Sequence, residues 1–318
     1  MNLKSFFDFV EIRTKLASVT PFLIGTLYAL YKYDSFKFEN AIIMFISLFA
    51  FDMATTGINN YLDYKKAHSR KGYNYEKHNA VVNHDIKEST ALAVIVMLLT
   101  TATALGVFLT LKTDIVVLVI GVLSFTTGIL YTFGPVPISR MPLGEVFSGF
   151  FMGFIIIFLA VYIHIFDQGI ALLSYSGTML TIHLNLIEVL SLFLFSIPAI
   201  AGIGNIMLAN NICDLDEDIL NKRYTLPHYI GKEKALKLFK ASYDIGYFSI
   251  IIAVVLNVAP TIILLAILTK IVLDKNIKRF AHNPSKREPF VLAVKNFIVV
   301  NGAVALLLGI AVVEKYVF

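Results

Sequence analysis

The sequence is poor in charge. Asp, Glu, Lys and Arg together make up 15% of its 318 residues, while 57% are apolar; a soluble domain carries roughly a quarter of charged residues. This balance excludes an ordinary water-soluble globular protein, because so apolar a chain needs an apolar solvent. Cysteine is almost absent as well. The only one, Cys213, excludes an internal disulfide and says little about the redox compartment.

The sequence also lacks obvious repeats and low-complexity stretches, and its first residues are not expected to form a signal peptide. Residues 1–15 carry acidic residues and Phe before any long apolar run, and no small-residue cleavage site follows them. We expect an amphipathic segment there that leads into the first membrane span. No stretch has the composition of a soluble domain, so residues 1–318 are predicted to form a single integral-membrane domain.

What the chain does have is a series of long apolar runs. About 20 helical residues cross the hydrocarbon core of a bilayer, and nearly uncharged runs of this length recur along the whole sequence. The predicted fold is therefore all-α: a polytopic membrane protein with nine transmembrane helices around a central cavity that opens to the cytoplasmic side. The expected spans are 17–33, 41–62, 89–110, 115–132, 143–165, 186–212, 243–258, 260–273 and 290–313.

The basic residues are distributed unevenly between the two sides of this topology. All but four of the 27 Lys and Arg residues fall in segments that nine spans place on one side. By the positive-inside rule that side is cytoplasmic, so we expect a cytoplasmic N-terminus and an extracytoplasmic C-terminus in the cell membrane. The net charge of +5 therefore reflects topology, and no nucleic-acid partner is expected. The four exceptions are Lys32, Lys37, Lys112 and Lys315.

Two polar clusters end apolar runs on the predicted cytoplasmic side. Residues 57–66 end the second expected span and residues 210–218 end the sixth. In each cluster an Asn precedes an Asp by four residues, which places both side chains on one face of a helix. The candidate oxygen ligands are Asn59 and Asp63 in the first cluster, and Asn210, Asp214 and Asp218 in the second.

Carboxylate and amide oxygens from two helices favour a hard cation. Mg²⁺ prefers a few carboxylates, several waters and the phosphate oxygens of a substrate, which suits a diphosphate. Diphosphate leaves carbon slowly until metal ions and fixed cations neutralise its charge. One acidic motif at a helix end is usually only solvated, but two such motifs at the ends of apolar spans are seldom accidental. The nearby basic residues are Arg70, Lys71, Lys222 and Arg223.

Four stretches resemble the UbiA-type intramembrane prenyltransferases, and within them the 1,4-dihydroxy-2-naphthoate polyprenyltransferase branch. They are residues 13–26, 59–66, 131–145 and 210–231, and their order and spacing extend over essentially the whole chain. The Tyr-Thr-Phe-Gly-Pro loop in the third stretch, and the Thr-Leu pair that follows the second aspartate motif, resemble this branch more than the 4-hydroxybenzoate and haem-farnesylating branches.

The resemblance implies a Mg²⁺-dependent transfer of a polyprenyl group from polyprenyl diphosphate to a small aromatic acceptor, 1,4-dihydroxy-2-naphthoate. The acceptor also loses CO₂, which yields demethylmenaquinol for menaquinone biosynthesis. Mg²⁺ would bind the five oxygen ligands above. The catalytic residues would be Asp63, Asp214, Asp218 and Arg223, and the substrate-binding residues Lys222, Arg70, Lys71, Arg140 and Tyr131.

The first motif departs from the family pattern. Asn60 stands where relatives carry an acid, so Asp63 is the one carboxylate left in this motif. In the second motif, Lys222 replaces a usual glycine. Glu76 or Asp85 in the first long loop could supply a carboxylate instead, although nothing in the spacing requires it.

Several other residues have two open interpretations. Asp52, two turns deeper than Asn59, could border the acceptor pocket or bond to another helix. Arg140 could pair with an acceptor carboxylate or only set topology. His78 and His84 are expected to be solvated loop residues. Most rings of the Phe-rich fifth span are expected in the core or facing lipid, and a minority could line an isoprenoid tunnel and shelter a carbocation: Phe147, Phe150, Phe151, Phe154 and Phe158.

Two alternatives to this function remain. A sister prenyltransferase that acts on another phenolic acceptor would share every feature of the metal site. A transporter or a non-catalytic paralogue is the second alternative, and the altered first motif favours it. Transporters often have internal repeats and helices broken at the bilayer midplane, whereas the polar clusters here lie at one interface. The sequence therefore favours the enzyme.

Overall fold

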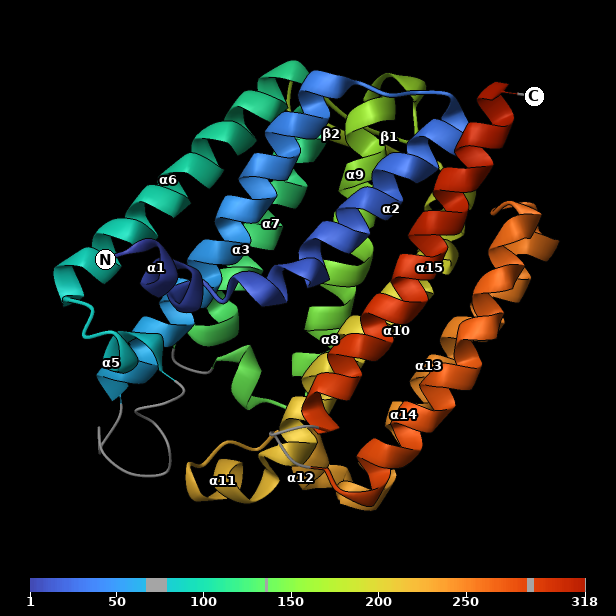
Figure 1. The fold of residues 1–318 in the computed structure, drawn as a ribbon. Coiled ribbons are helices and arrows are strands. Elements are labelled where there is room, and N and C mark those ends of the chain that lie inside the picture. The colour runs from blue at the N-terminus through green and yellow to red at the C-terminus, as the bar shows by residue number, and fades with distance from the viewer. Residues whose placement is uncertain (67–78, 135–136, 285–288, 318) are drawn as a thin grey trace.

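The structure is a computed structural model that describes residues 1–66, 79–134, 137–284 and 289–317 (Figure 1). Elements labelled η are 3-10 helices, except η3, which is a π-helix. The first part of the chain forms α1 (Leu3–Phe9), η1 (Ile12–Lys15), α2 (Leu16–Tyr33), α3 (Phe38–Lys66), α5 (Ala80–Asn83), α6 (Glu88–Lys112) and α7 (Ile115–Thr132). The middle forms η2 (Ile138–Arg140), α8 (Gly144–Ser148), η3 (Gly149–Ile155), α9 (Ile156–Ile165), η4 (Phe166–Gln168), β1 (Ala171–Ser176), β2 (Met179–Leu184) and α10 (Leu186–Cys213). The last part forms α11 (Leu215–Leu220), α12 (Leu226–Ile230), α13 (Lys232–Val255), η5 (Thr261–Thr269), α14 (Lys270–His282) and α15 (Pro289–Val317).

Seven helices in the described part of the chain are long and apolar enough to cross a membrane, which confirms a multi-pass membrane protein. They are Phe38–Lys65, Glu88–Lys112, Ile115–Thr132, Gly144–Gln168, Leu186–Cys213, Lys232–Val255 and Val291–Val317. Each overlaps one of the nine expected spans. The helix Lys232–Val255, which corresponds to the expected span 243–258, begins earlier than expected because its polar first half belongs to the same helix.

The two remaining expected spans are shorter or less apolar. Residues 17–33 form α2, which has 18 residues and includes Pro21 and Lys32. Residues 260–273 form η5 and the first turn of α14, and η5 has nine residues in the tighter 3-10 conformation. A total of nine crossings therefore stays a prediction.

The all-α prediction is incomplete, because the connection between η4 and α10 forms an antiparallel hairpin of β1 and β2. Its two strands have six residues each. A search for apolar runs of bilayer length overlooks so short an element. The rest of the described secondary structure is helical.

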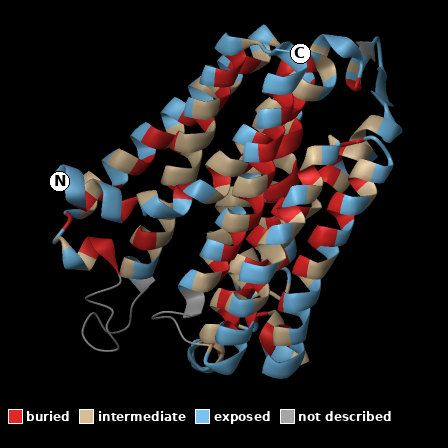
Figure 2. Ribbon diagram, turned by 45° about the vertical axis from the view of Figure 1, so that its right-hand side comes forward, coloured by how far each residue is buried: buried red, intermediate tan, exposed pale blue. Residues whose placement is uncertain are grey.

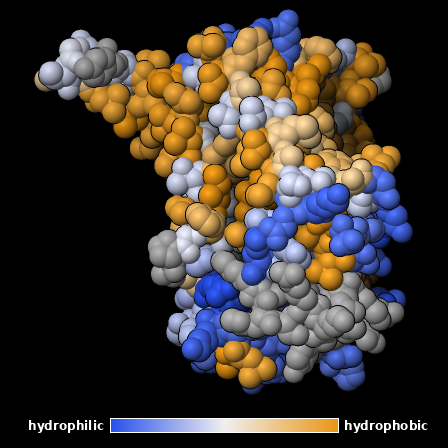
Figure 3. Space-filling model, turned by 90° about the vertical axis from the view of Figure 1, so that its left-hand side faces the viewer, coloured by the Kyte–Doolittle hydropathy of each residue, from blue (hydrophilic) through white to orange (hydrophobic). Residues whose placement is uncertain are grey.

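The outer surface of the bundle is rich in large apolar side chains. Val96 and Met97 on α6 and Val119 and Leu123 on α7 are exposed at the surface of the bundle. A soluble monomer rarely exposes such contiguous apolar surface, so these faces fit contact with lipid. On the side drawn in Figure 3, hydrophobic surface dominates the upper part and hydrophilic residues gather towards the lower end.

The buried residues form two separate clusters, seen in red inside the bundle in Figure 2. The larger cluster joins α2, α9, α10, α13, η5, α14 and α15, and it also includes residues of α3, α6, α7 and η3. The smaller one joins α1, α3, α5 and α6, and includes Phe9, Ala54 and Ile95. The helices α3 and α6 contribute to both clusters.

Close packing of η3 on α10 depends on glycine. A Cβ atom on Gly149 would lie 2.8 Å from the carbonyl oxygen of Ile200, and one on Gly153 would lie 2.6 Å from the Ile200 backbone nitrogen. Real Cβ atoms do not approach so closely, so both positions need glycine. The continuous helix of α8, η3 and α9 is thereby held directly against α10.

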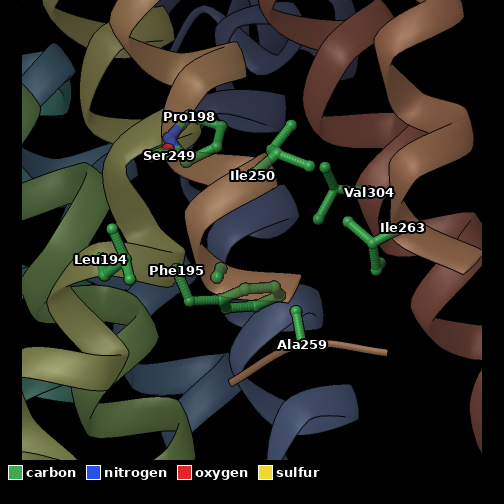
Figure 4. Close-up of a pocket in the computed structure, with 9 residues that line it drawn as sticks. Leu194, Phe195, Pro198, Ser249, Ile250, Ala259, Ile263 and Val304 are labelled. Carbon is green, nitrogen blue, oxygen red and sulfur yellow. The ribbon is translucent and has the colours of Figure 1, made fainter. Parts of the chain in front are cut away.

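Pro198 lies in the middle of α10, where its ring removes one backbone hydrogen bond of the helix. Beside it is a void of about 10 Å³ lined by apolar side chains, and the Ser249 hydroxyl donates to the Gly246 carbonyl oxygen (2.7 Å). Figure 4 shows the lining residues converging on this void. It is roughly the size of one water molecule and has few polar groups to bind one, so we assign it to packing and not to function.

Candidate functional site

A cavity of about 500 Å³ lies among α2, α3, α6, α7, α8, η3, α9 and α10. Most of its walls are apolar, and several are aromatic. The rings of Phe51 and Phe125 stack with centroids 3.9 Å apart, and those of Phe147 and Phe151 are nearly parallel at 6.1 Å. A cavity of this size and lining can hold a small, largely apolar molecule.

The Phe-rich helix divides between cavity, core and surface, as the sequence suggested. Phe147 and Phe151 line the cavity. Phe154 and Phe158 are buried in the larger core, and Phe150 is exposed. Only a minority of the rings are therefore placed to stabilise a cation in the cavity by cation–π attraction.

One wall of the cavity carries a buried ion pair. Lys15 donates to Asp52 Oδ1 (2.7 Å) and to Thr56 Oγ1 (2.6 Å), and Ser18 donates to Asp52 Oδ2 (2.5 Å). Asp52, Ser18 and Thr56 all line the cavity, whereas Lys15 is buried behind them. Asp52 therefore bonds between helices, as one of the two interpretations expected, and its side chain also borders the cavity.

The first motif contributes to two different environments. Asn59 lines the cavity, one turn of α3 beyond Thr55. Asp63, a further turn along, is exposed and makes contacts with other residues. The two predicted ligands of the first motif therefore lie in different places: Asn59 on the cavity wall and Asp63 near the exposed end of α3.

Asn60 faces away from Asn59 and is buried. Its side-chain amide donates to the Phe9 carbonyl oxygen (2.9 Å) and to Glu11 Oε1 (3.3 Å), and its own carbonyl accepts from Asn79 (2.8 Å). The residue that replaces the usual acid therefore attaches the N-terminal segment to α3. This is a structural reason for an amide at this position, because a carboxylate could not donate to Phe9.

The second motif is buried at the end of α10. Asp214 and Asp218 are both buried, and Asn210 is half-buried. The Asp214 amide donates to the Asn210 carbonyl (3.0 Å), and the Asp218 amide donates to the Asp214 carbonyl (2.7 Å). These bonds continue the helical spacing across the break between α10 and α11, so the three side chains stay on one face.

Arg223 returns to this motif from the turn after α11. Its guanidinium lies 3.3 Å from Asp218 Oδ1 and donates to the Ser139 carbonyl oxygen (3.3 Å). Its backbone amide donates to the Asp218 carbonyl (2.8 Å), while the Thr225 hydroxyl lies 3.5 Å from Asp218 Oδ2. The Arg223 Nε atom is buried and has no hydrogen-bond partner among the described residues.

The remaining predicted substrate-binding residues surround this motif at different depths. Tyr131 lines the cavity, and its hydroxyl accepts a hydrogen bond from Ser148 (3.1 Å). Arg140 is exposed, and its carbonyl accepts from the Tyr224 amide (3.3 Å), which joins the two loops. Lys222 is exposed in the turn after α11.

Glu145 and Asn211 form a buried pair that sequence reasoning did not find. Asn211 donates to Glu145 Oε1 (2.8 Å). Glu145 Oε2 and Asn211 Oδ1 are also buried, and neither has a hydrogen-bond partner among the described residues. In the sequence, Glu145 is a single acidic residue after the Tyr-Thr-Phe-Gly-Pro loop, and Asn211 is a single polar residue beside Asn210, so neither has a pattern that indicates the pair.

The predicted ligands do not all meet. Among the described residues, no group of three or more His, Cys, Asp and Glu side chains is close enough to hold a metal ion, so Asp63 does not join Asp214 and Asp218 in such a group. Asp85 is exposed after α5, and His84 lies 2.8 Å from Asp8 Oδ2 and is not simply solvated. Four predicted residues lie outside the described part of the chain: Arg70, Lys71, Glu76 and His78.

The second motif nevertheless fits Mg²⁺ by its chemistry. Asp214 and Asp218 offer buried carboxylates on successive turns, beside a guanidinium with an unpartnered N–H. Mg²⁺ is typically held by one or two protein carboxylates together with substrate phosphates and waters. Two carboxylates and one basic group are therefore compatible in chemistry with Mg²⁺ and a diphosphate.

The family model of the UbiA prenyltransferase family matches residues 18–289. The 1,4-dihydroxy-2-naphthoate octaprenyltransferase of Bacillus subtilis (strain 168) is 28% identical to this chain over 305 residues, which are 95% of this chain and 90% of that protein. The match thus extends over nearly the full length of both proteins.

Two solved structures have a similar fold. A UbiA homologue from Aeropyrum pernix K1 has a TM-score of 0.63 at 17% identity and covers 93% of this chain and 98% of that one. A UbiA homologue from Archaeoglobus fulgidus bound to DMAPP and Mg²⁺ has a TM-score of 0.62 at 12% identity and covers 98% and 99%. At such identities the likeness establishes the fold alone.

Proposed function

The chain belongs to the UbiA prenyltransferase family, and on this premise we propose that it transfers a polyprenyl group from polyprenyl diphosphate to 1,4-dihydroxy-2-naphthoate. The observation that carries the proposal is the 28% identity to the B. subtilis octaprenyltransferase over 95% of this chain. The product is demethylmenaquinol, an intermediate of menaquinone biosynthesis, because the acceptor also loses CO₂.

The second motif is the proposed diphosphate end of the site. Asp214 and Asp218, with Asn210 alongside, would hold Mg²⁺, which would supply positive charge to neutralise the diphosphate leaving group. Among the described residues, Asp63 does not join these carboxylates in one cluster, so we propose that Asn59 and Asp63 bind the metal–diphosphate complex separately, from the side of α3. Arg223 adds a fixed cation next to Asp218, and its unpartnered Nε–H is available to a phosphate oxygen.

Exposed basic side chains around the second motif are proposed to assist in binding the diphosphate. They carry positive charge to a substrate whose two phosphates are strongly negative, so they act mainly on its affinity. Lys222 and Arg140 are exposed beside the second motif. Arg70 and Lys71 belong to the same proposed set.

The apolar cavity is the proposed place of reaction. Ionisation of the allylic C–O bond leaves a carbocation, which needs surroundings without water and with electron-rich faces. Phe51, Phe147 and Phe151 provide such faces on the cavity wall. The electron-rich ring of the acceptor then attacks the cation, and Tyr131 lies on the wall of this cavity.

The polar wall formed by Ser18, Asp52 and Thr56 is the proposed contact for the acceptor. A hydroxyl group on an aromatic acceptor can donate to Asp52, whose carboxylate lies on the cavity surface and accepts from Lys15 and Ser18. An ion pair inside an apolar wall costs desolvation energy, and such intramembrane charges generally mark function.

The proposed topology has nine crossings, with α2 and the η5–α14 segment added to the seven apolar helices. The N-terminus is then cytoplasmic, the C-terminus extracytoplasmic, and the cavity opens to the cytoplasm near the second motif. The distribution of Lys and Arg supports this orientation. In Figure 1 the C-terminus lies at the end of the bundle opposite to α11 and α12, which agrees with it.

The test is prenyl transfer by the purified protein in detergent or vesicles, with 1,4-dihydroxy-2-naphthoate, polyprenyl diphosphate and Mg²⁺, followed by mass spectrometry. The expected product has the mass of the prenylated, decarboxylated acceptor.

Asp218→Asn should lower turnover at least about a hundredfold while the protein still inserts, because it removes charge from the site that stabilises the leaving group. Asp216→Asn, at an exposed neighbour, is the matched control and should keep activity.

A different phenolic acceptor is the alternative, since every feature of the metal site would serve it equally. Offering 4-hydroxybenzoate and homogentisate in parallel separates the two. Product from either of these, and none from dihydroxynaphthoate, would transfer the proposal to a sister activity. Absence of any product with all acceptors, in folded protein, would favour a non-catalytic paralogue or a transporter.

A further inference from the structure

The β1–β2 hairpin has two chemically different faces. Side chains alternate along a strand, and residues directly opposite in an antiparallel pair share a face. The register pairs Leu173 with Ile182 and Ser174 with Thr181. One face therefore holds Ala171, Leu173, Leu180, Ile182 and Leu184, and the other holds Leu172, Ser174, Ser176, Met179, Thr181 and His183.

Ala171 and Leu173 on the apolar face pack against the core, but the residues of this face on β2 are not covered by the rest of the described chain. Leu180 is 65% exposed, Ile182 60% and Leu184 51%. A lone two-stranded hairpin is at best marginally stable in water, so this one needs another surface to cover these side chains. Figure 3 shows the surface in question as a mostly hydrophobic arm that extends sideways from the upper end of the bundle.

The base of the hairpin is held at the ends of two membrane spans. It begins three residues after the span Gly144–Gln168 and ends just before the span Leu186–Cys213. The Tyr162 hydroxyl contacts the Ala171 carbonyl oxygen (3.1 Å) and Asp114 Oδ2 (2.5 Å), and the Asn185 amide donates to the Ile170 carbonyl (2.9 Å). An arm that leaves the bundle sideways at this level extends over the surrounding lipid.

We propose that this hairpin lies flat on the bilayer surface, with its apolar face on the boundary between headgroups and acyl chains. Residues 168–187 contain no Asp, Glu, Lys or Arg, so no charge opposes contact with a layer of low polarity. Full insertion is excluded, because the free edges of both strands carry unpaired backbone groups that the hydrocarbon core does not tolerate. The interface satisfies both requirements, since those edges can meet water and headgroups there.

Such an anchor affects the walls of the candidate site. α9 and α10 flank the hairpin, and both contribute side chains to the cavity, among them Leu159, Ile163 and Met207. Contact of the hairpin with lipid holds the ends of these two helices at a constant depth. The proposal does not depend on which acceptor the protein uses.

The absence of Trp from the chain makes a direct test simple. Single Trp residues are introduced as Ile182→Trp on the apolar face and Thr181→Trp on the opposite face, and each full-length protein is reconstituted in phosphatidylcholine vesicles. Part of the lipid carries bromine atoms near the top of the acyl chains, which quench nearby Trp fluorescence. We expect at least threefold stronger quenching in the Ile182→Trp variant than in the Thr181→Trp variant, with emission shifted to shorter wavelength.

Three results would overturn the proposal. Equal quenching at both positions would mean that the hairpin has no preferred face towards lipid. Emission from position 182 typical of water would place the arm in solvent. Blue-shifted but unquenched emission would mean that a second copy of the chain covers the face. Leu180→Trp, on the same face, repeats the test if the first variant does not fold, as judged by circular dichroism and gel filtration.

Discussion

At the scale of single residues, Asn60 shows how an apparent gap in a metal motif can have a structural cause. Its amide donates to the Phe9 carbonyl and to Glu11 Oε1. An ionised Asp there would lose the donor and place a second negative charge beside Glu11. We expect Asn60→Asp to destabilise the fold by about 1–3 kcal/mol and not to lower the Mg²⁺ requirement.

Thermal unfolding followed by circular dichroism, together with a Mg²⁺ titration of product formation, measures both effects for Asn60→Asp. Asn60→Gln, which keeps a donor, is the matched control. Half-maximal activity at a lower Mg²⁺ concentration, with unchanged stability, would show that position 60 is a ligand position after all.

Glu145 and Asn211 present two buried acceptor atoms side by side without donors among the described residues. A proton on Glu145, or the amide of a glutamine, would supply the missing donor to Asn211. We expect Glu145→Gln to unfold at the same temperature as the parent, and Glu145→Leu to lose about 1–3 kcal/mol, because it leaves the Asn211 side chain buried and unpaired. If Gln destabilises as much as Leu, the pair needs the negative charge itself, as it would around a cation.

Replacing the ion pair of Lys15 and Asp52 can show whether the pair serves the stability of the fold or the binding of the acceptor. Replacing a buried pair as a whole by apolar residues is often neutral or stabilising. We expect Lys15→Met/Asp52→Leu to fold normally, to raise the KM for the acceptor at least tenfold, and to leave the KM for polyprenyl diphosphate unchanged. Steady-state kinetics with one substrate varied at a time checks this, and equal changes in both KM values would assign the pair to general packing of the cavity.

At the scale of elements, the turn that joins α11 to α12 contains a residue in a strained backbone conformation, Lys222. Lys222 has a φ of 54°, in the left-handed region that glycine adopts without cost. Lys222→Gly should therefore stabilise the fold by about 1 kcal/mol. Both Lys222→Gly and Lys222→Ala remove the charge, so both should raise the KM for polyprenyl diphosphate several-fold, while only the glycine variant should melt at a higher temperature. An unchanged KM in both would leave Lys222 as a turn residue only.

The same scale explains why the second motif is the better-formed half of the site. Its carboxylates lie at a helix break, where α10 stops and the chain turns back through Arg223 to Asp218. The first motif lies on one uninterrupted helix, α3, so its side chains diverge along the axis from the cavity to the exposed end. A return of the chain brings charge partners together that a single helix keeps apart.

At the scale of the whole molecule, the orientation in the membrane can be tested with cysteine labelling. In a Cys213→Ser background, Ala281→Cys on the predicted cytoplasmic side should be shielded from a membrane-impermeant thiol reagent in intact cells. Gln168→Cys, exposed at the other end, should react, since Lys and Arg place that end outside. Both should react after permeabilisation. Labelling of the Ala281→Cys variant in intact cells would reverse the topology and place the candidate site outside.

Composition and the order of charges were enough to establish a multi-pass helical membrane protein, and local motifs were enough to establish its family. These properties are read along the chain, because a span is a continuous run and a motif is a fixed spacing. The same spacing put Asp214 and Asp218 on one face, and the structure places Arg223 beside Asp218. The spacing also joined Asn59 and Asp63 as ligands, whereas in the structure Asn59 lines the cavity and Asp63 is exposed further along α3.

Folding alone decided which distant residues meet. Lys15 and Asp52 are 37 positions apart, and Glu145 and Asn211 are 66 apart; each is an ordinary polar residue until helix packing buries the two together. The hydrogen bond of Asn60 to Phe9 is also a product of folding, because the sequence does not say which side of α3 the N-terminal segment packs against. The β1–β2 hairpin was not predicted for a different reason. Its alternation of polar and apolar residues is short, and only the pairing of the two strands divides these residues between two faces.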